Sequence, residues 1–215
     1  MKNQDNIFIK GEGDEWFSRN REALYAKSRN IKKDHPFYMM DKFLDVPPKK
    51  VLEVGCSNGW RLSEIEKRYK SKCVGIDPSK DAISDGRKLY PGITLKQGVA
   101  SSLPIREKFD LVIVSFVFHW ISRETLLQSV AEIDRVVAGD GYLIISDFLP
   151  DFPSKVSYHH LPNKNVFTYK LDYTDIFTST ALYTIVARLT FDHDRKGFSS
   201  KISSYSRGVC SLLRR

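Results

Sequence analysis

Two hydrophobic patterns alternate along residues 51–148: short, almost continuous apolar runs, and longer segments with apolar residues at helical spacing. The apolar runs predict strands at 51–54, 72–78, 93–97, 109–115 and 142–147. The segments between them predict helices at 61–69, 79–89 and 122–137. Strands that alternate with helices are typical of a parallel sheet covered on both faces. We therefore predict an α/β fold with three layers, of the Rossmann-like kind.

The flanking segments extend this plan. Helical stretches at about 15–27, after Gly13 and Asp14, and at 36–44 precede the first strand and are predicted to form a lid above the carboxyl ends of the strands, where open α/β sheets bind ligands. Late runs at about 181–191 and 205–213 are predicted to complete a seven-stranded, mostly parallel sheet with an antiparallel last strand. The predicted division is an N-terminal helical lid and substrate segment at 1–46 and an α/β domain at 47–215.

The turn after the first strand has the most specific pattern, Glu-Val-Gly-Cys-Ser-Asn-Gly at residues 53–59. Glycines let a backbone approach a ligand closely, and a strand-to-helix turn is expected to direct unpaired N–H groups and a positive helix end towards it. The spacing lacks the second and third glycines of a dinucleotide fingerprint, where Ser57 and Trp60 stand, and the Gly-Lys-Ser/Thr ending of a P-loop. An ordinary strand-to-helix turn remains the alternative.

Asp77 ends the second predicted strand, immediately before Pro78. In nucleotide-binding parallel sheets an acid at this place accepts hydrogen bonds from ribose hydroxyls. The alternative is a local role, in which Asp77 caps the next helix or forms an Asx turn before Pro78.

The pattern Glu-x-Gly-x-x-x-Gly resembles the first motif of the class I S-adenosylmethionine-dependent methyltransferases, which usually have another glycine where Ser57 stands. The loop 98–104 is similar to the Gly-Asp-Ala-x-x-Leu-Pro segment of that family, with Val99 in place of the acid that accepts a hydrogen bond from adenine. Residues 116–121, with His119, are similar to the segment after its fourth strand. The resemblance covers residues 49–148 and implies S-adenosylmethionine as cofactor, with S-adenosylhomocysteine as product.

The resemblance also implies which residues form the cofactor site. They are Glu53, Gly55, Cys56, Ser57, Asn58, Gly59, Asp77, Pro78, Val99, Ala100, Ser101, Ser115 and Phe116. Because Val99 is not an acid, adenine recognition is expected from backbone groups and from Ser101 or Ser102. Trp16 and Arg19 of the predicted lid are candidates to contact methionine or the substrate, unless the aromatic residues there simply pack on the domain.

Methyl transfer from an activated sulfonium requires in-line positioning and exclusion of water, and a base if the acceptor is a hydroxyl. His119, His160 and His159 are the catalytic candidates, because the unperturbed pKa of histidine suits a base at neutral pH. The alternatives are that His119 is a packed core residue and that the other two are ordinary loop residues. No metal site is predicted, since adjacent histidines on a strand point apart and residues 192–194 are expected to form a turn.

Composition and charge restrict the picture further. A chain of 215 residues, 41% hydrophobic, suits one domain with a substantial core. The net charge of +8 divides into +3 for residues 1–50, zero for 51–150 and +5 for 151–215, which indicates either a phosphate-attracting rim or solvated faces. Three separated cysteines, the absence of an apolar N-terminal segment and the lack of a membrane-length apolar run predict a cytoplasmic location and no membrane partner.

These patterns predict a methyltransferase that acts on a small molecule, such as a sugar or sugar nucleotide, at oxygen or nitrogen. The acceptor class rests on a weaker resemblance of residues 13–20 and 158–173 to bacterial methylases of nonulosonic-acid and other surface-sugar pathways. A tRNA or other RNA methyltransferase is the alternative, although the chain lacks the Asn/Asp-Pro-Pro-Tyr motif of many base-modifying enzymes after the fourth strand. A non-catalytic cofactor-binding partner protein is a third hypothesis, kept open by Val99. Oligomeric state is not predicted.

Overall fold

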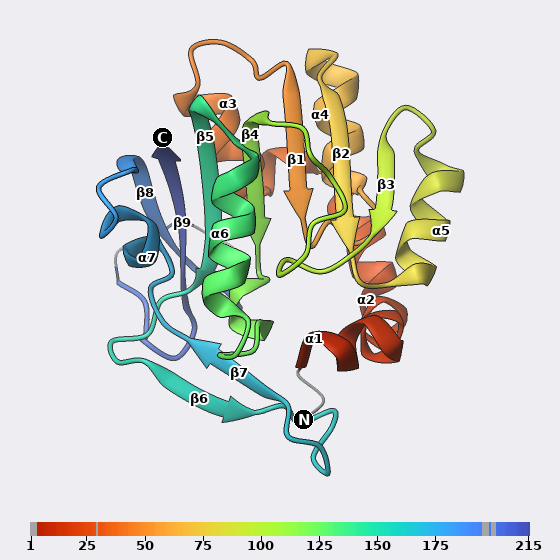
Figure 1. Cartoon of the computed structure of the whole chain (residues 1–215), viewed down its shortest axis with the longest axis vertical. Helices are drawn as coiled ribbons and strands as arrows, with labels where there is room; N and C mark the ends of the chain where they lie inside the picture. The colour runs from red at the N-terminus through yellow and green to blue at the C-terminus, as the bar shows by residue number, and fades with distance from the viewer. Residues whose placement is uncertain (1–3, 29, 195–197, 199–200) are drawn as a thin grey trace.

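A seven-stranded sheet with the strand order β3-β2-β1-β4-β5-β9-β8 forms the centre of the molecule (Figure 1). The structure, a computed structural model, describes residues 4–28, 30–194, 198 and 201–215. The strands are β1 (Lys50–Val54), β2 (Lys72–Asp77), β3 (Thr94–Gln97), β4 (Phe109–Ser115), β5 (Val137–Phe148), β8 (Thr184–Asp192) and β9 (Arg207–Arg214). The first five are parallel, whereas β9 is antiparallel to both β5 and β8. The predicted fold class is confirmed.

Helices cover both faces of the sheet because its central strands are apolar on both sides. Val51 of β1 packs with α2 (Gly13–Ser28), α3 (His35–Phe43), α4 (Trp60–Tyr69) and α5 (Lys80–Leu89), whereas the next residue, Leu52, packs with α6 (Leu126–Val136) and α7 (Thr174–Thr178). The same alternation holds in β4, where Leu111 faces the first group of helices and Val112 the second. The result is three layers with two hydrophobic cores.

Helix α3 belongs to the core, whereas the sequence pattern places it in a lid. Its residues Phe37, Met39 and Met40 are buried against the face formed by Leu111 and Ile144. The N-terminal elements that lie at the carboxyl ends of the strands are α1 (Gln4–Ile7) and η1 (Phe8–Glu12), near the lower edge of the sheet in Figure 1. The division of the chain at residue 46 stays a prediction. A lid function also stays a prediction, and it now concerns the residues before α3.

Strand β5 begins earlier than its apolar run indicates. Val137 pairs with Phe109 and Tyr142 pairs with Leu111, so the residues between Val137 and Tyr142 are accommodated by a shift of register. The glycines at 139 and 141, which predict a turn, lie inside this irregular part of the strand.

A separate hairpin of β6 (Ser154–Ser157) and β7 (Phe167–Lys170) forms a second, two-stranded sheet. It lies at the lower edge of the molecule in Figure 1, beside η3 (Phe118–Trp120), the short helix that follows β4. The remaining short element is η2 (Ile31–Lys33), before α3. The hairpin therefore extends the carboxyl edge of the main sheet.

Candidate functional site

The turn between β1 and α4 has a backbone that favours glycine. Gly55 and Gly59 have φ angles of +76° and +78°, and Ser57 between them has +52°. A Cβ atom on Gly55 would lie 2.1 Å from Cγ2 of Val117, in the segment after β4. The two glycines found in the sequence are therefore required by conformation, and Gly55 also by a close contact.

Several amide groups of this turn are bonded within the protein, whereas the sequence pattern predicts unpaired N–H groups. Gly55 and Cys56 donate their N–H groups to the carbonyl oxygen of Ile76, at 2.7 and 3.1 Å. Ser57 donates its N–H to Oδ2 of Asp77, at 2.7 Å. A turn whose amides are satisfied in this way is poorly suited to hold a phosphate, so ligand recognition here falls mainly to side chains.

Side chains at the turn do offer polar atoms. Within the part of the chain that the structure describes, Glu53 Oε2, Ser57 Oγ and Asn58 Oδ1 are buried and have no hydrogen-bond partner. Burial raises the pKa of Glu53 to about 7, although its other oxygen is paired with buried Arg61. Unpaired buried polar atoms are costly, and three of them together at one turn fit a ligand rich in polar groups.

The carboxylate of Asp77 also supports its own turn. Its Oδ2 accepts the N–H of Ser57, and its Oδ1 accepts the N–H of Ser79 at 2.9 Å. Burial raises the pKa of Asp77 to about 6. Each carboxylate oxygen can accept a second hydrogen bond. The local and the ribose-binding interpretations of Asp77 are therefore compatible.

Residues 4–12, which we call the N-terminal strap, cross the carboxyl edge of the sheet. Gln4 donates to the carbonyl oxygens of Trp120 and Phe167, at 2.5 and 2.7 Å. Asp5 accepts a hydrogen bond of 2.7 Å from the hydroxyl of Ser101. The strap thus joins the loop after β3 to η3 and β7.

The contact with Asp5 changes the interpretation of the loop after β3. Val99 stands where an acid is expected, and the nearby hydroxyl of Ser101 is directed to Asp5. A carboxylate is therefore present at this loop, but it comes from the strap. Sequence reasoning missed Asp5 because it lies 96 positions from Ser101 and belongs to no motif.

A second contact fixes the end of the strap. Oε1 of buried Glu12 accepts hydrogen bonds from Arg19, at 2.5 Å, and from the hydroxyl of Tyr158, at 2.7 Å. Arg19 also donates to the Tyr158 hydroxyl at 2.8 Å. Trp16 is partly buried against the core formed by α2 to α5. The guanidinium of Arg19 is therefore engaged by Glu12 and Tyr158, and a contact of Arg19 with methionine or substrate stays a prediction.

His119 forms a buried pair with Asp147, at the end of β5. The Nδ1 atom of His119 lies 2.9 Å from Oδ1 of Asp147, and its backbone N–H donates to Oδ2 at 3.2 Å. The rings of Phe148 and Phe116 have their centroids 5.0 and 6.0 Å from the imidazole centroid. The contact at Nδ1 does not have hydrogen-bond geometry in the described structure, so one of the two groups would have to rotate before the carboxylate could fix the imidazole tautomer.

The structure does not bring His159 and His160 together with His119. The rings of Trp120 and Tyr158 lie between them, and both histidines are exposed in a turn. The pKa of His160 is lowered, chiefly by loss of hydration and also by the nearby Arg19.

The structure instead places His193 near His119. Its ring centroid lies 5.3 Å from that of Phe116 and 5.1 Å from that of Phe148. Asp192, the first residue of the predicted turn at 192–194, is the last residue of β8, and the turn continues past the end of that strand. His193 therefore lies just after β8, beside Phe116 and Phe148. No group of three or more His, Cys, Asp and Glu side chains suited to a metal ion occurs among the residues described.

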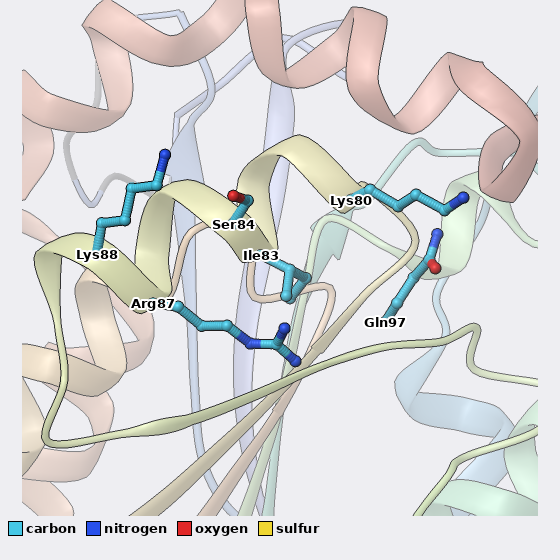
Figure 2. A pocket seen from close by; sticks show the side chains of 6 residues that line it. All are labelled: Lys80, Ile83, Ser84, Arg87, Lys88 and Gln97. Carbon is cyan, nitrogen blue, oxygen red and sulfur yellow. The ribbon is translucent and has the colours of Figure 1, made fainter.

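Two surface cavities lie away from the turn and from His119. One, of about 350 Å³, is lined by Lys80, Ile83, Ser84, Arg87, Lys88 and Gln97 (Figure 2). Arg87 donates to the carbonyl oxygen of Leu95 at 2.7 Å, so part of its charge serves to join α5 to β3. The other, of about 400 Å³, is lined by Pro150, Asp151, Pro153, Leu171, Asp172, Asp175, Ile176 and Ser179. Every helix in the described ranges is too short or too polar to cross a bilayer.

Sequence comparison finds a family that the central part of the chain matches. Residues 52–145 match the family described as the methyltransferase domain. An uncharacterised methyltransferase of Alkaliphilus oremlandii is 27% identical over 113 residues, which are 53% of this chain and 51% of that protein. A fatty-acid O-methyltransferase of Mycolicibacterium smegmatis is 31% identical over 112 residues, 50% of this chain and 40% of that protein. The chain spans about half the length of the curated relatives it matches, or less.

Comparison with solved structures supports the same fold. The 1,6-didemethyltoxoflavin-N1-methyltransferase of Burkholderia thailandensis, solved with 1,6-didemethyltoxoflavin and S-adenosylhomocysteine, has a TM-score of 0.66. It is 14% identical, and the superposition covers 92% of this chain and 86% of that one. The segment that matches the family contains the turn at Gly55, the acid Asp77 and His119. Residues 52–145 therefore match the methyltransferase-domain family, and the chain has the Rossmann-like fold of the solved methyltransferases to which it is similar.

Proposed function

We propose that the chain transfers a methyl group from S-adenosylmethionine to a small-molecule acceptor, and that His119 is the base when the acceptor is a hydroxyl. The main support is the position of two groups at one edge of one sheet: the turn with Ser57 and Asp77, and the buried pair of His119 with Asp147. In open α/β sheets this edge is where ligands bind.

The residues present fit the cofactor. Asp77 would accept hydrogen bonds from ribose hydroxyls through its remaining lone pairs. Glu53, Ser57 and Asn58 have buried unpaired oxygens that would receive the polar methionine end. The loop at Val99, supported by Asp5 through Ser101, would lie on the adenine side.

S-adenosylmethionine would supply an electrophilic methyl group that is already activated. Nε2 of His119 would take the proton of the acceptor hydroxyl, and the Asp147 carboxylate would stabilise the resulting imidazolium. The rings of Phe116 and Phe148 would exclude water beside it. An amine acceptor with a free lone pair would depend less on His119.

A sugar or sugar nucleotide remains our proposed acceptor, on the sequence resemblance alone. The names of two compared proteins specify small acceptors, a fatty acid and 1,6-didemethyltoxoflavin, and this favours a small molecule in general. An RNA acceptor is a second candidate, because Lys80, Arg87 and Lys88 line one groove beside α5 (Figure 2). Binding of bulk tRNA that weakens steeply with salt would favour RNA.

Calorimetric titration with S-adenosylhomocysteine tests the cofactor site. We expect Asp77→Ala to bind at least about tenfold more weakly than wild type, since a lost charge-assisted hydrogen bond costs about 1.5–3 kcal/mol. Asp110→Ala is a matched control, because Asp110 also accepts two backbone N–H groups, from Lys49 and Lys50, but at the opposite edge of the sheet. Equal affinities of the two variants would contradict the proposed site.

Turnover with labelled donor and an extract of small metabolites tests the base. We expect His119→Ala to lower turnover about 10²-fold or more while changing affinity for S-adenosylhomocysteine by less than about twofold. His159→Ala and His160→Ala serve as comparisons, because these exposed side chains lie outside the Asp147 pair. A greater loss of turnover in His160→Ala than in His119→Ala would assign the base to His160 and contradict the proposal for His119.

A further inference from the structure

The β6–β7 hairpin presents two lysines that differ in their surroundings. In its register Ser154 pairs with Lys170 and Lys155 pairs with Tyr169. Side chains alternate between the faces of a strand, and paired residues share a face. Lys155 and Lys170 therefore lie on opposite faces of the hairpin.

The ammonium group of Lys170 is held by aromatic rings. Its Nζ atom lies 4.0 Å from the ring centroid of Phe148 and 5.6 Å from that of Tyr205. Loss of hydration lowers the pKa of Lys170, while Asp147 and Asp194 act in the opposite direction. In the described structure, neither of these two carboxylates lies within 4.0 Å of the Lys170 ammonium, so neither forms an ion pair with it. An aromatic ring attracts a cation but is a poor acceptor of hydrogen bonds from its N–H groups. The three N–H donors of Lys170 are therefore available to an anion.

Lys170 borders the proposed catalytic pair through one ring. The Phe148 ring that contacts Lys170 also lies 5.0 Å from the imidazole of His119 and 5.1 Å from that of His193, between centroids. Phe148 directly follows Asp147, the partner of His119. The His119 imidazole and the Lys170 ammonium are therefore separated by at most the sum of their distances to the Phe148 centroid, which is within the reach of a small molecule.

We propose that Lys170 binds an anionic group, a carboxylate or a phosphate, on the acceptor, so that the acceptor is an anionic small molecule. This inference rests on the proposed function and specifies its substrate class. An ammonium that is already partly dehydrated and fixed by aromatic rings loses little hydration and little rotamer freedom when it pairs with an anion. The Asp147 carboxylate lies 2.9 Å from the His119 imidazole and forms no ion pair with Lys170 in the described structure, so the Lys170 ammonium can pair with an anion of the acceptor.

The charge of the acceptor can be measured before its identity is known. The wild-type chain is incubated with methyl-labelled donor and a small-metabolite extract freed of macromolecules, and the labelled product is applied to an anion-exchange resin with and without prior treatment with phosphodiesterase and phosphatase. We expect the product to be retained. Loss of retention after treatment with phosphodiesterase and phosphatase together identifies a phosphate, and retention that persists identifies another anion such as a carboxylate. A labelled product that passes through the resin as a neutral or cationic molecule would overturn the proposal.

Kinetics with the purified acceptor fraction test the residue. We expect Lys170→Met to raise KM about tenfold or more with kcat within about twofold, and Lys170→Arg to recover most of that loss. Lys155→Met is the matched control, since Lys155 also lies over an aromatic ring, 3.8 Å from the Phe167 centroid, but on the other face. Thermal unfolding of each variant reports whether the hairpin is intact.

Equal KM values for Lys170→Met and Lys155→Met, with both variants folded, would overturn the assignment to Lys170. Failure of the proposed function would look different. A wild-type chain that does not bind S-adenosylhomocysteine in the calorimeter would remove both the function and this inference, whatever the charge of the metabolites offered.

Discussion

The carboxylate of Asp77 is buried, and its pKa of about 6 predicts that the proposed cofactor site is sensitive to pH. A ribose hydroxyl donates its hydrogen bond to the ionised carboxylate, and protonation occupies one of the acceptor sites. The affinity for S-adenosylhomocysteine should therefore be full above about pH 7 and should decline as the pH falls through 6, by up to about tenfold per unit. Calorimetry between pH 5 and 8 measures this slope.

Asp77→Asn supplies the control, because an amide does not titrate in this range. Any slope that remains in that variant reports other groups, above all Glu53, whose pKa lies at about 7. Identical slopes in wild type and Asp77→Asn would show that Asp77 does not govern binding.

Ser57 occupies a backbone conformation that suits glycine. Its φ of +52° costs a residue with a Cβ about 1–2 kcal/mol, and glycine in turn costs about 0.5–1 kcal/mol of unfolded-chain entropy. We expect Ser57→Gly to leave the free energy of unfolding unchanged or raise it by up to about 1 kcal/mol. Ser57→Ala, which keeps the strain, should show no such gain in a denaturant titration.

The same two variants test the unpaired hydroxyl of Ser57. If Oγ binds the cofactor, both should weaken S-adenosylhomocysteine binding severalfold, since a neutral hydrogen bond contributes about 0.5–1.5 kcal/mol. A variant that is more stable and yet binds less tightly would separate the two roles. Unchanged affinity in both would exclude a cofactor contact by Oγ.

Residues whose role depends on local backbone chemistry could be predicted from the sequence. Gly55 is recognisable because a strand-to-helix turn needs its φ angle, and Asp77 because it ends a strand. The partners of the site could not be predicted in this way. Asp147 lies 28 positions from His119, and Lys170 meets Phe148 across two separate sheets. No local pattern specifies such pairs, since only the assembled fold brings them together.

At the scale of elements, α5 packs against the β1–α4 turn without space for a side chain at Gly86. A Cβ there would lie 2.1 Å from the carbonyl oxygen of Asn58. Alanine inside a helix normally stabilises by about 1 kcal/mol relative to glycine, but here it must displace a backbone. We expect Gly86→Ala to lower both the free energy of unfolding and the affinity for S-adenosylhomocysteine. Ser84→Ala, on the exposed side of the same helix, should stabilise slightly, and a stabilised Gly86→Ala would contradict the packing.

Helical periodicity predicts that a helix forms but not which surface it covers. The apolar face of α3, with Phe37 and Met40, suits a lid and a core equally well. The helix packs against Leu111 because it covers the sheet at β9 and β5. The sheet order, which periodicity does not reveal, determines that position. The π-helical turn η1, with a non-helical residue at Gly11, likewise has no periodic signal by which it could be predicted.

At the scale of the whole molecule, the N-terminal strap connects both sides of the carboxyl edge. Gln4 makes three hydrogen bonds, two to carbonyl oxygens of Trp120 and Phe167 and one from the N–H of Phe167. If the strap closes over the cofactor, Gln4→Ala should speed dissociation of S-adenosylhomocysteine about tenfold, since lost hydrogen bonds cost about 1 kcal/mol each. Stopped-flow displacement measures this rate. Gln128→Ala, on the exposed side of α6, is the control, and equal rates in the two variants would exclude a closing role.

The hairpin of β6 and β7 is bonded as a sheet of its own. Substitutions in it leave the ladder of the seven-stranded sheet and the turn at Gly55 untouched. If Lys170 binds the acceptor, a change at position 170 alone would alter the charge that the acceptor must carry. Tyr158 and Phe167 of the same segment would have to stay, because they bond the strap. Substitution at position 170 with these two residues retained therefore offers a way to redirect the acceptor preference by design.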